Sequence, residues 1–215
     1  MEFPGHVLDC NEVGPTDCKL KAVRYWPILT SRKNLQAFLG FVNYYRRFIP
    51  HLARIAQPLN DLLKADTRFN WTPNCQQASE DLRLALVKGP SVKICDPSLE
   101  TRIETDASGH ALGAVLSQQH SDGWQPVAFL SRTMTKPERN YPIQDQEPLV
   151  LVFALRKWRH YLFGTEITAY TDHPSLGTWE TNRDLSGRKS SWTELLSEFS
   201  VEIVYRKGQD NIVAD

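Results

Sequence analysis

Four acidic side chains of this 215-residue chain stand at positions from which carboxylates can act together: Asp106, Glu147, Asp172 and Asp215. The first lies in the stretch IETDASGHALGAVL, residues 103–116. An unpaired carboxylate inside a sheet costs several kcal/mol, so Asp106 must be paired, protonated or bound to a cation. Hard divalent cations such as Mg2+ take oxygen ligands and bind phosphate directly. The four acids therefore predict a site for two divalent cations, although each acid alone also suits a helix cap or a solvated turn.

Strands and one long helix are expected to position these acids. Segments that alternate or run apolar with β-branched residues predict strands at 99–107, 110–119, 124–134, 166–173 and 201–209. Helical patterns occur at 144–164, 175–182 and 188–198. Asp106 and Asp172 then end strands, Glu147 opens the long helix, and Asp215 follows the last strand. Acids placed in this way can converge on one edge of an α/β layered structure.

The first half of the chain is expected to be mainly helical. Apolar residues recur at helical spacing within 32–48. A second helix over 52–64 is interrupted or begins anew near Pro58. A third is expected at 73–88, with Thr72 as its N-cap and proline in its first position.

The pattern changes from helical to strand-like after a segment that reads as a linker, residues 90–97. This change predicts one domain over residues 1–92 and a second over residues 93–215.

The composition is that of a globular protein, with 41% hydrophobic and 23% charged residues. The sequence has no apolar run long enough to cross a bilayer and no secretory signal, so an intracellular protein of the cytoplasm or nucleus is expected. The four cysteines form no C-x-x-C pair, which argues against a zinc site and favours reduced thiols.

The net charge is zero, but positions 18–60 carry eight Lys or Arg residues and no Asp or Glu. Such a segment is a candidate phosphate-facing surface, with Arg46, Arg47 and Arg54 as the predicted nucleic-acid contacts. The alternative is a helix whose aromatic residues pack inward while its arginines stay solvated.

Several motifs, taken in chain order, resemble the ribonuclease H domain of gypsy-type LTR retrotransposon reverse transcriptases. They are TDASGHALGAVLSQ, NYPIQDQEPLVLVFALRKWRHYLFG, YTDH and VEIVYRKGQDNIVAD. Upstream motifs resemble the stretch that follows the polymerase palm, with its primer-contacting hairpin, thumb and connection: FPGHV, LQAFLGFVNYYRRFIPHLARIAQPLNDLLK and FNWTPNCQQASEDL. The resemblance covers nearly the whole chain.

This resemblance implies a ribonuclease H-like mixed five-stranded sheet with flanking helices, preceded by a small, mainly helical thumb and connection region. It implies two Mg2+ ions, with Mn2+ as an alternative, and cleavage of the RNA strand of an RNA/DNA hybrid. The implied partners are that hybrid and the remainder of a reverse transcriptase polyprotein, with no membrane. The implied catalytic residues, which are also the metal ligands, are Asp106, Glu147, Asp172 and Asp215.

Three departures from the family pattern bear on activity. Pro148 disfavours a helical conformation at Glu147, so the helix is expected to restart there and displace the Glu147 carboxylate. The sequence ends at Asp215, where the family continues into a helix, so the domain is expected to be truncated there. No Asp-Asp pair occurs, so no polymerase activity is expected. A catalytically inactive nucleic-acid-binding remnant, or a partner-binding scaffold, is therefore the alternative function.

Overall fold

The computed structural model describes residues 2–3, 5–9, 12–88, 91–108, 110–171 and 187–206. The chain forms two compact units, Met1–Ile94 and Cys95–Asp215. The roles predicted for the two domains, thumb and connection in 1–92 and ribonuclease H in 93–215, stay predictions.

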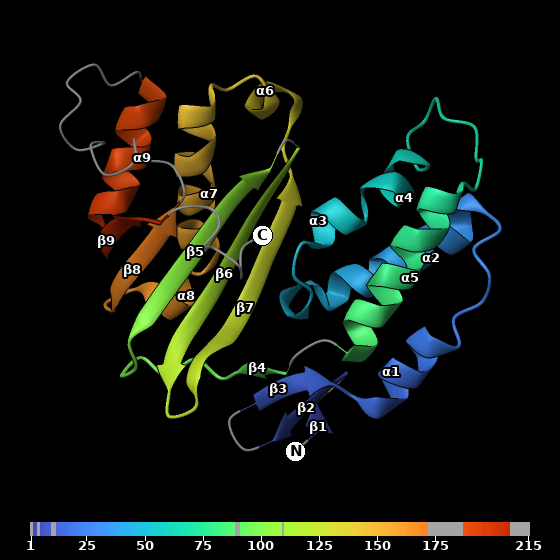
Figure 1. Ribbon diagram of the computed structural model, residues 1–215, viewed down its shortest axis with the longest axis horizontal. Helices are drawn as coiled ribbons and strands as arrows, with labels where there is room; N and C mark the ends of the chain where they lie inside the picture. Colours follow the sequence, from blue (N-terminus) through green and yellow to red (C-terminus); the bar gives the residue numbers. More distant parts are fainter. Residues whose placement is uncertain are drawn as a thin grey trace. The chain divides into compact units, whose positions relative to one another are not determined.

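The second unit is built on a five-stranded mixed sheet with the strand order β7-β6-β5-β8-β9 (Figure 1). Strands β5, β6 and β7 form an antiparallel meander, β8 runs parallel to β5, and β9 runs parallel to β8. Each of the five predicted strands is present, and the ends predicted for 166–173 and 201–209 lie outside the described residues. Their bounds are Thr101–Ser108 (β5), Ala111–His120 (β6), Gly123–Thr133 (β7), Glu166–Thr171 (β8) and Ser200–Tyr205 (β9).

Helix α7, Ile143–Lys157, packs on β5 and β6 and closes the core of this unit. Successive side chains of a strand point to opposite faces of the sheet. On the face of β5 that α7 covers, Ile103 is fully buried in one cluster with Leu151 and Leu155 of α7. The predicted helix 144–164 ends earlier than expected, at Lys157, and Trp158 separates it from a short helix, α8. The predicted helix 175–182 lies outside the described residues. The other helices of the unit are α6 (Lys136–Arg139), α8 (Arg159–Leu162) and α9 (Gly187–Ser197).

Pro148 does not break α7. The helix begins at Ile143 and runs through Pro148, so the prediction that it restarts at the proline and leaves Glu147 as a cap is wrong. Pro148 has no N–H to donate to the carbonyl of Gln144, which removes one helix hydrogen bond. Burial of Leu149 and Val150 against the sheet offsets this loss, since core packing outweighs local propensity.

The first unit is mainly helical, as predicted. Helix α2 follows the N-cap Ser31, whose side chain accepts a hydrogen bond from the Asn34 N–H. Helix α5 follows Thr72, whose hydroxyl accepts from the Cys75 N–H, so the predicted N-cap is confirmed. The helices are α1 (Asp17–Arg24), α2 (Arg32–Tyr44), η1 (Arg46–Phe48), α3 (Leu52–Ile55), α4 (Gln57–Asp61) and α5 (Pro73–Lys88).

A small four-stranded sheet in this unit was not predicted from the residue pattern, although the resemblance at FPGHV implies a hairpin, which β1 and β2 form. Its strand β4, Val92–Lys93, lies within the segment read as a linker and pairs with β3, where Lys93 Nζ lies 2.7 Å from Glu12 Oε1. Two-residue strands carry no periodicity, and these partners lie far apart in the sequence, so only the folded chain reveals the pairing. The other strands are β1 (Glu2–Phe3), β2 (His6–Asp9) and β3 (Glu12–Pro15).

Candidate active site

The candidate site lies where β5 and β8 come to their carboxyl ends. The parallel ladder between these strands ends at the pair Glu104 and Tyr170. Beyond that pair β5 continues through Asp106, which is paired on its other side with Gly113 of β6. Asp172 and Asp215 lie outside the described residues, so the structure reports on two of the four predicted carboxylates.

Glu147 reaches this strand end from α7 and is only 4% exposed. Its Oε1 accepts a hydrogen bond from the Ala107 N–H at 3.1 Å, and its Oε2 accepts one from the Thr171 hydroxyl at 3.4 Å. Ala107 follows Asp106 in the sequence, and Thr171 precedes Asp172. The fold therefore places the Glu147 carboxylate between the end of β5 that carries Asp106 and Thr171, the last residue of β8.

Within the described ranges no three His, Cys, Asp or Glu side chains are grouped closely enough to hold a metal ion. Two of the four predicted ligands lie outside those ranges. The complete carboxylate set, Asp106, Glu147, Asp172 and Asp215, thus stays a prediction.

A buried ionic cluster beside Asp106 was missed by the sequence reasoning. The side chain of Glu104 is 2% exposed, and its Oε1 lies 3.3 Å from Arg206 Nη1 and 3.5 Å from Arg102 Nη2. The Arg206 guanidinium lies 3.9 Å from the centroid of the Tyr170 ring. Burial lowers the pKa of Arg102, and the charge of Glu104 opposes that shift. The available signal was the alternation of charged residues in RIETD, which marks one face of β5.

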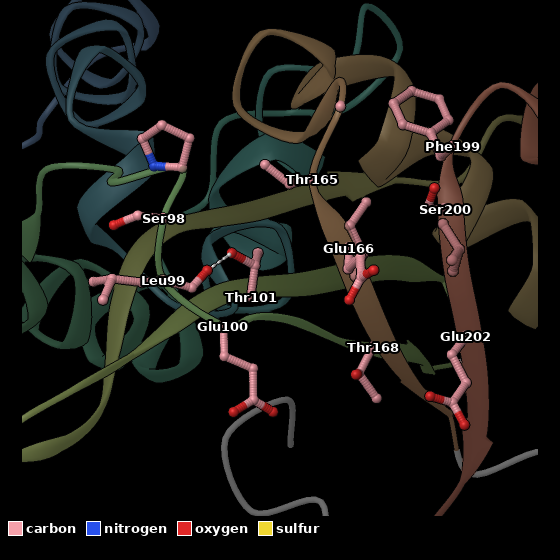
Figure 2. A pocket seen from close by; sticks show the side chains of 14 residues that line it. Ser98, Leu99, Glu100, Thr101, Thr165, Glu166, Thr168, Phe199, Ser200 and Glu202 are labelled. Atoms are coloured by element: carbon pink, nitrogen blue, oxygen red, sulfur yellow. Dashed lines mark hydrogen bonds between the residues drawn. The ribbon is translucent and has the colours of Figure 1, made fainter.

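A hollow of the second unit lies at the opposite ends of the same strands (Figure 2). It has a volume of about 840 Å³ and is lined by the start of β5 and the amino ends of β8 and β9. Glu100, Glu166 and Glu202 contribute carboxylates to its lining. Because Asp106 and Glu147 stand at the carboxyl ends of this sheet, the hollow is not part of the candidate nuclease site.

The predicted nucleic-acid contacts lie in the first unit on short helices. Arg46 and Arg47 belong to η1 and are half-buried, whereas Arg54 of α3 is exposed. The guanidinium of Arg47 lies 5.4 Å from the ring centroid of Phe48, which is itself buried. Burial lowers the pKa of His6, and the positive charge of Arg47 lowers it further. Phe38, Tyr45 and Phe48 of this segment pack inward, whereas Tyr44 is exposed, and the role of its arginines stays a prediction.

Comparison with known proteins decides the family. Residues 96–199 match the RNase H-like domain found in reverse transcriptase. The whole chain aligns at 41% identity over 222 residues with the Transposon Tf2-3 polyprotein of Schizosaccharomyces pombe, of which it spans 16%. The chain belongs to the gypsy-type LTR retrotransposon polyproteins. The Transposon Tf2-4 polyprotein of the same yeast aligns equally well, so this retrotransposon chain corresponds to about a sixth of either relative.

Solved reverse transcriptases share the fold of the retrotransposon chain. The foamy viral protease-reverse transcriptase dRH in complex with double-stranded DNA matches 94% of this chain and 38% of its own, with a TM-score of 0.76 and 20% identity. The foamy viral protease-reverse transcriptase in complex with an RNA/DNA hybrid matches 96% of this chain and 29% of its own, with a TM-score of 0.75 and 21% identity. The predicted fold is confirmed: a ribonuclease H-like mixed five-stranded sheet preceded by a helical region. None of the described helices is both long and apolar enough to cross a bilayer.

Proposed function

We propose that this retrotransposon segment cleaves the RNA strand of RNA/DNA hybrids by metal-dependent hydrolysis. The observation that carries the proposal is the position of the Glu147 carboxylate between Ala107 and Thr171. The Glu147 carboxylate of α7 thereby lies next to the peptide group that joins Asp106 to Ala107 on β5. A cation site that both acids share requires such proximity. We propose Asp106, Glu147, Asp172 and Asp215 as the catalytic and metal-binding set.

The residues present suit a hard divalent cation. Carboxylate oxygens are the ligands that Mg2+ and Mn2+ take in proteins. Glu147 is buried, and its hydrogen bonds from the Ala107 N–H and the Thr171 hydroxyl restrict the orientation of its carboxylate. A pair of bound Mg2+ ions would supply an activated water and stabilise the leaving 3′-oxygen. Asp106 and Glu147 would bind these ions through carboxylate oxygens held in a fixed arrangement.

The proposed substrate follows from the family and from the chemistry of the duplex. A related viral protein has been solved in complex with an RNA/DNA hybrid. The 2′-hydroxyl distinguishes the RNA strand from DNA, and phosphate contacts position a duplex without reading its sequence. Arg46, Arg47 and Arg54 are the proposed phosphate contacts. The remainder of the polyprotein is the proposed covalent partner.

The test is cleavage of an end-labelled RNA/DNA hybrid in Mg2+ or Mn2+, beside an all-DNA duplex. We expect cleavage of the hybrid only, and a loss of at least about 100-fold in Asp106→Asn and in Glu147→Gln, because misplaced catalytic groups cost rates of this order. Glu166→Gln is the matched control, since Glu166 is exposed at the opposite end of β8. Hybrid binding without cleavage by the folded chain would instead support the inactive, nucleic-acid-binding alternative.

A further inference from the structure

We infer that Thr171 is a positioning residue for the candidate site, whose hydroxyl orients the carboxylate of Glu147. The inference rests on the proposed function, because a fixed carboxylate matters there only if it holds a cation. Thr171 is the last residue of β8 and is 2% exposed. Its Oγ1 lies 3.4 Å from Glu147 Oε2.

The row of side chains to which Thr171 belongs is otherwise apolar. Alternation along β8 places Ile167, Ala169 and Thr171 on one face, and the first two are buried in the core with α7. Valine at position 171 would fill the same space in the core, because its side chain has nearly the same shape as that of threonine. A buried hydroxyl costs free energy unless it is hydrogen-bonded, so threonine at this place calls for a polar partner. Glu147 is such a partner.

Two donors are needed because a glutamate side chain does not fix its own carboxylate. The terminal torsion of glutamate is broad and roughly two-fold, so packing of the stem leaves the plane of the two oxygens free. The Ala107 N–H holds Oε1 from the β5 side, and the Thr171 hydroxyl holds Oε2 from the β8 side. Together the two contacts define that plane.

The proline beside Glu147 increases the importance of these contacts. Pro148 lacks the N–H that would pair with the Gln144 carbonyl, so the backbone next to Glu147 has one restraint fewer than an ordinary helix. Mg2+ demands a nearly ideal octahedral arrangement of ligands. Loss of the Thr171 hydroxyl should therefore weaken cation binding rather than merely loosen the core.

Three variants of the full 215-residue chain separate these roles. Thr171→Val removes the hydroxyl at nearly constant shape, and Thr171→Ser retains it. Thr101→Val is the matched control, because the buried Thr101 hydroxyl donates to the Leu99 carbonyl at the far end of β5. Each variant is titrated with Mn2+ alone by calorimetry. We expect Thr171→Val to raise the Mn2+ concentration for half-saturation about 10-fold, and Thr171→Ser and Thr101→Val to change it less than about 3-fold.

A second measurement needs no metal. It is a double-mutant cycle of Thr171→Val with Glu147→Leu, measured by denaturant unfolding. We expect Thr171→Val to lower the folding equilibrium constant about 10-fold when Glu147 is present. The same substitution should lower it much less when leucine replaces Glu147. An additive cycle, or wild-type Mn2+ affinity in Thr171→Val, overturns the inference. If the wild-type chain binds no Mn2+ and cleaves no hybrid, the proposed function fails. The cycle then still decides whether the hydroxyl holds Glu147.

Discussion

Oε1 of Glu147 lies 3.1 Å from the backbone nitrogen of Ala107, forty positions earlier in the chain. This hydrogen bond joins the helix that carries one predicted catalytic acid to the strand that carries another, Asp106. Because the β5–β8 ladder ends at Glu104 and Tyr170, the Ala107 N–H beyond that pair is available to a side chain. The helix glutamate and the strand aspartate are thus connected through one peptide group.

Replacing the proline in α7 should stabilise the second unit. Pro148→Ala restores the N–H for the Gln144 carbonyl but gives up some buried contact, so we expect the free energy of unfolding to rise by about 1–2 kcal/mol. Chemical denaturation measures the change. Pro137→Ala is the control, because Pro137 stands in the first turn of α6, where no helix hydrogen bond is lost. A loss of stability in Pro148→Ala would show that packing of the proline ring outweighs the missing bond.

The Arg132–Glu138 ion pair should make stability depend on pH in the acid range. Hydrogen bonds from Arg132, at 2.7 and 2.8 Å, and from the Thr135 N–H lower the pKa of Glu138 from 4.5 to about 2. Since the folded pKa lies below the unfolded one, the stabilisation is fully present above pH 4.5 and is lost as the pH falls through about 2. Its size is at most about 3 kcal/mol.

Unfolding of Arg132→Gln measured between pH 7 and pH 3 tests this pair. We expect its deficit relative to the wild type to be largest near neutral pH and to shrink as the pH falls below about 4.5. Arg139→Gln is the control, since Arg139 donates to the Met134 carbonyl and forms no ion pair with a carboxylate among the described residues. A deficit that does not change with pH would mean that Arg132 acts mainly by stacking on Phe153, whose ring centroid lies 4.5 Å away.

Neutralising the buried glutamate of β5 should be strongly destabilising. Glu104→Gln leaves the guanidinium groups of Arg102 and Arg206 without their counter-charge, and we expect a loss of about 3–5 kcal/mol in the free energy of unfolding. Glu202→Gln is the control on strand β9 of the same sheet, because Glu202 is exposed, and it should change stability by less than about 0.5 kcal/mol. Equal effects of the two substitutions would contradict the structural role of the cluster.

The basic segment 18–60 should contribute to salt-sensitive binding of the hybrid. Arg54→Gln is the cleanest probe, because Arg54 is exposed whereas Arg47 stacks on Phe48. If Arg54 contacts a phosphate, the slope of log affinity against log salt concentration should decrease by about 1. Arg68→Gln, an exposed arginine of the same unit outside the segment, should leave the slope unchanged. Fluorescence anisotropy of a labelled hybrid at several salt concentrations gives both slopes.

Sequence patterns predicted the elements well where the signal is local. Alternation of apolar residues located the five strands, and the Thr72-Pro73 pair located the start of α5, because both depend on a few neighbouring residues. Pro148 shows the limit of local rules, since its preference for a helix break was overcome by burial of the residues that follow it. Strand β4 was missed because two residues carry no period.

By itself, the sequence determined which family the chain resembles and placed Asp106 on a strand and Glu147 on the long helix, whereas the positions of Asp172 and Asp215 stay predictions. Only the tertiary structure decided that Glu147 is held by Ala107 and Thr171, and that Glu104 is enclosed by Arg102 and Arg206. The physical reason is that these partners are brought together by strand order and parallel pairing. Such contacts join residues up to 102 positions apart, and no repeat of two or 3.6 residues encodes them.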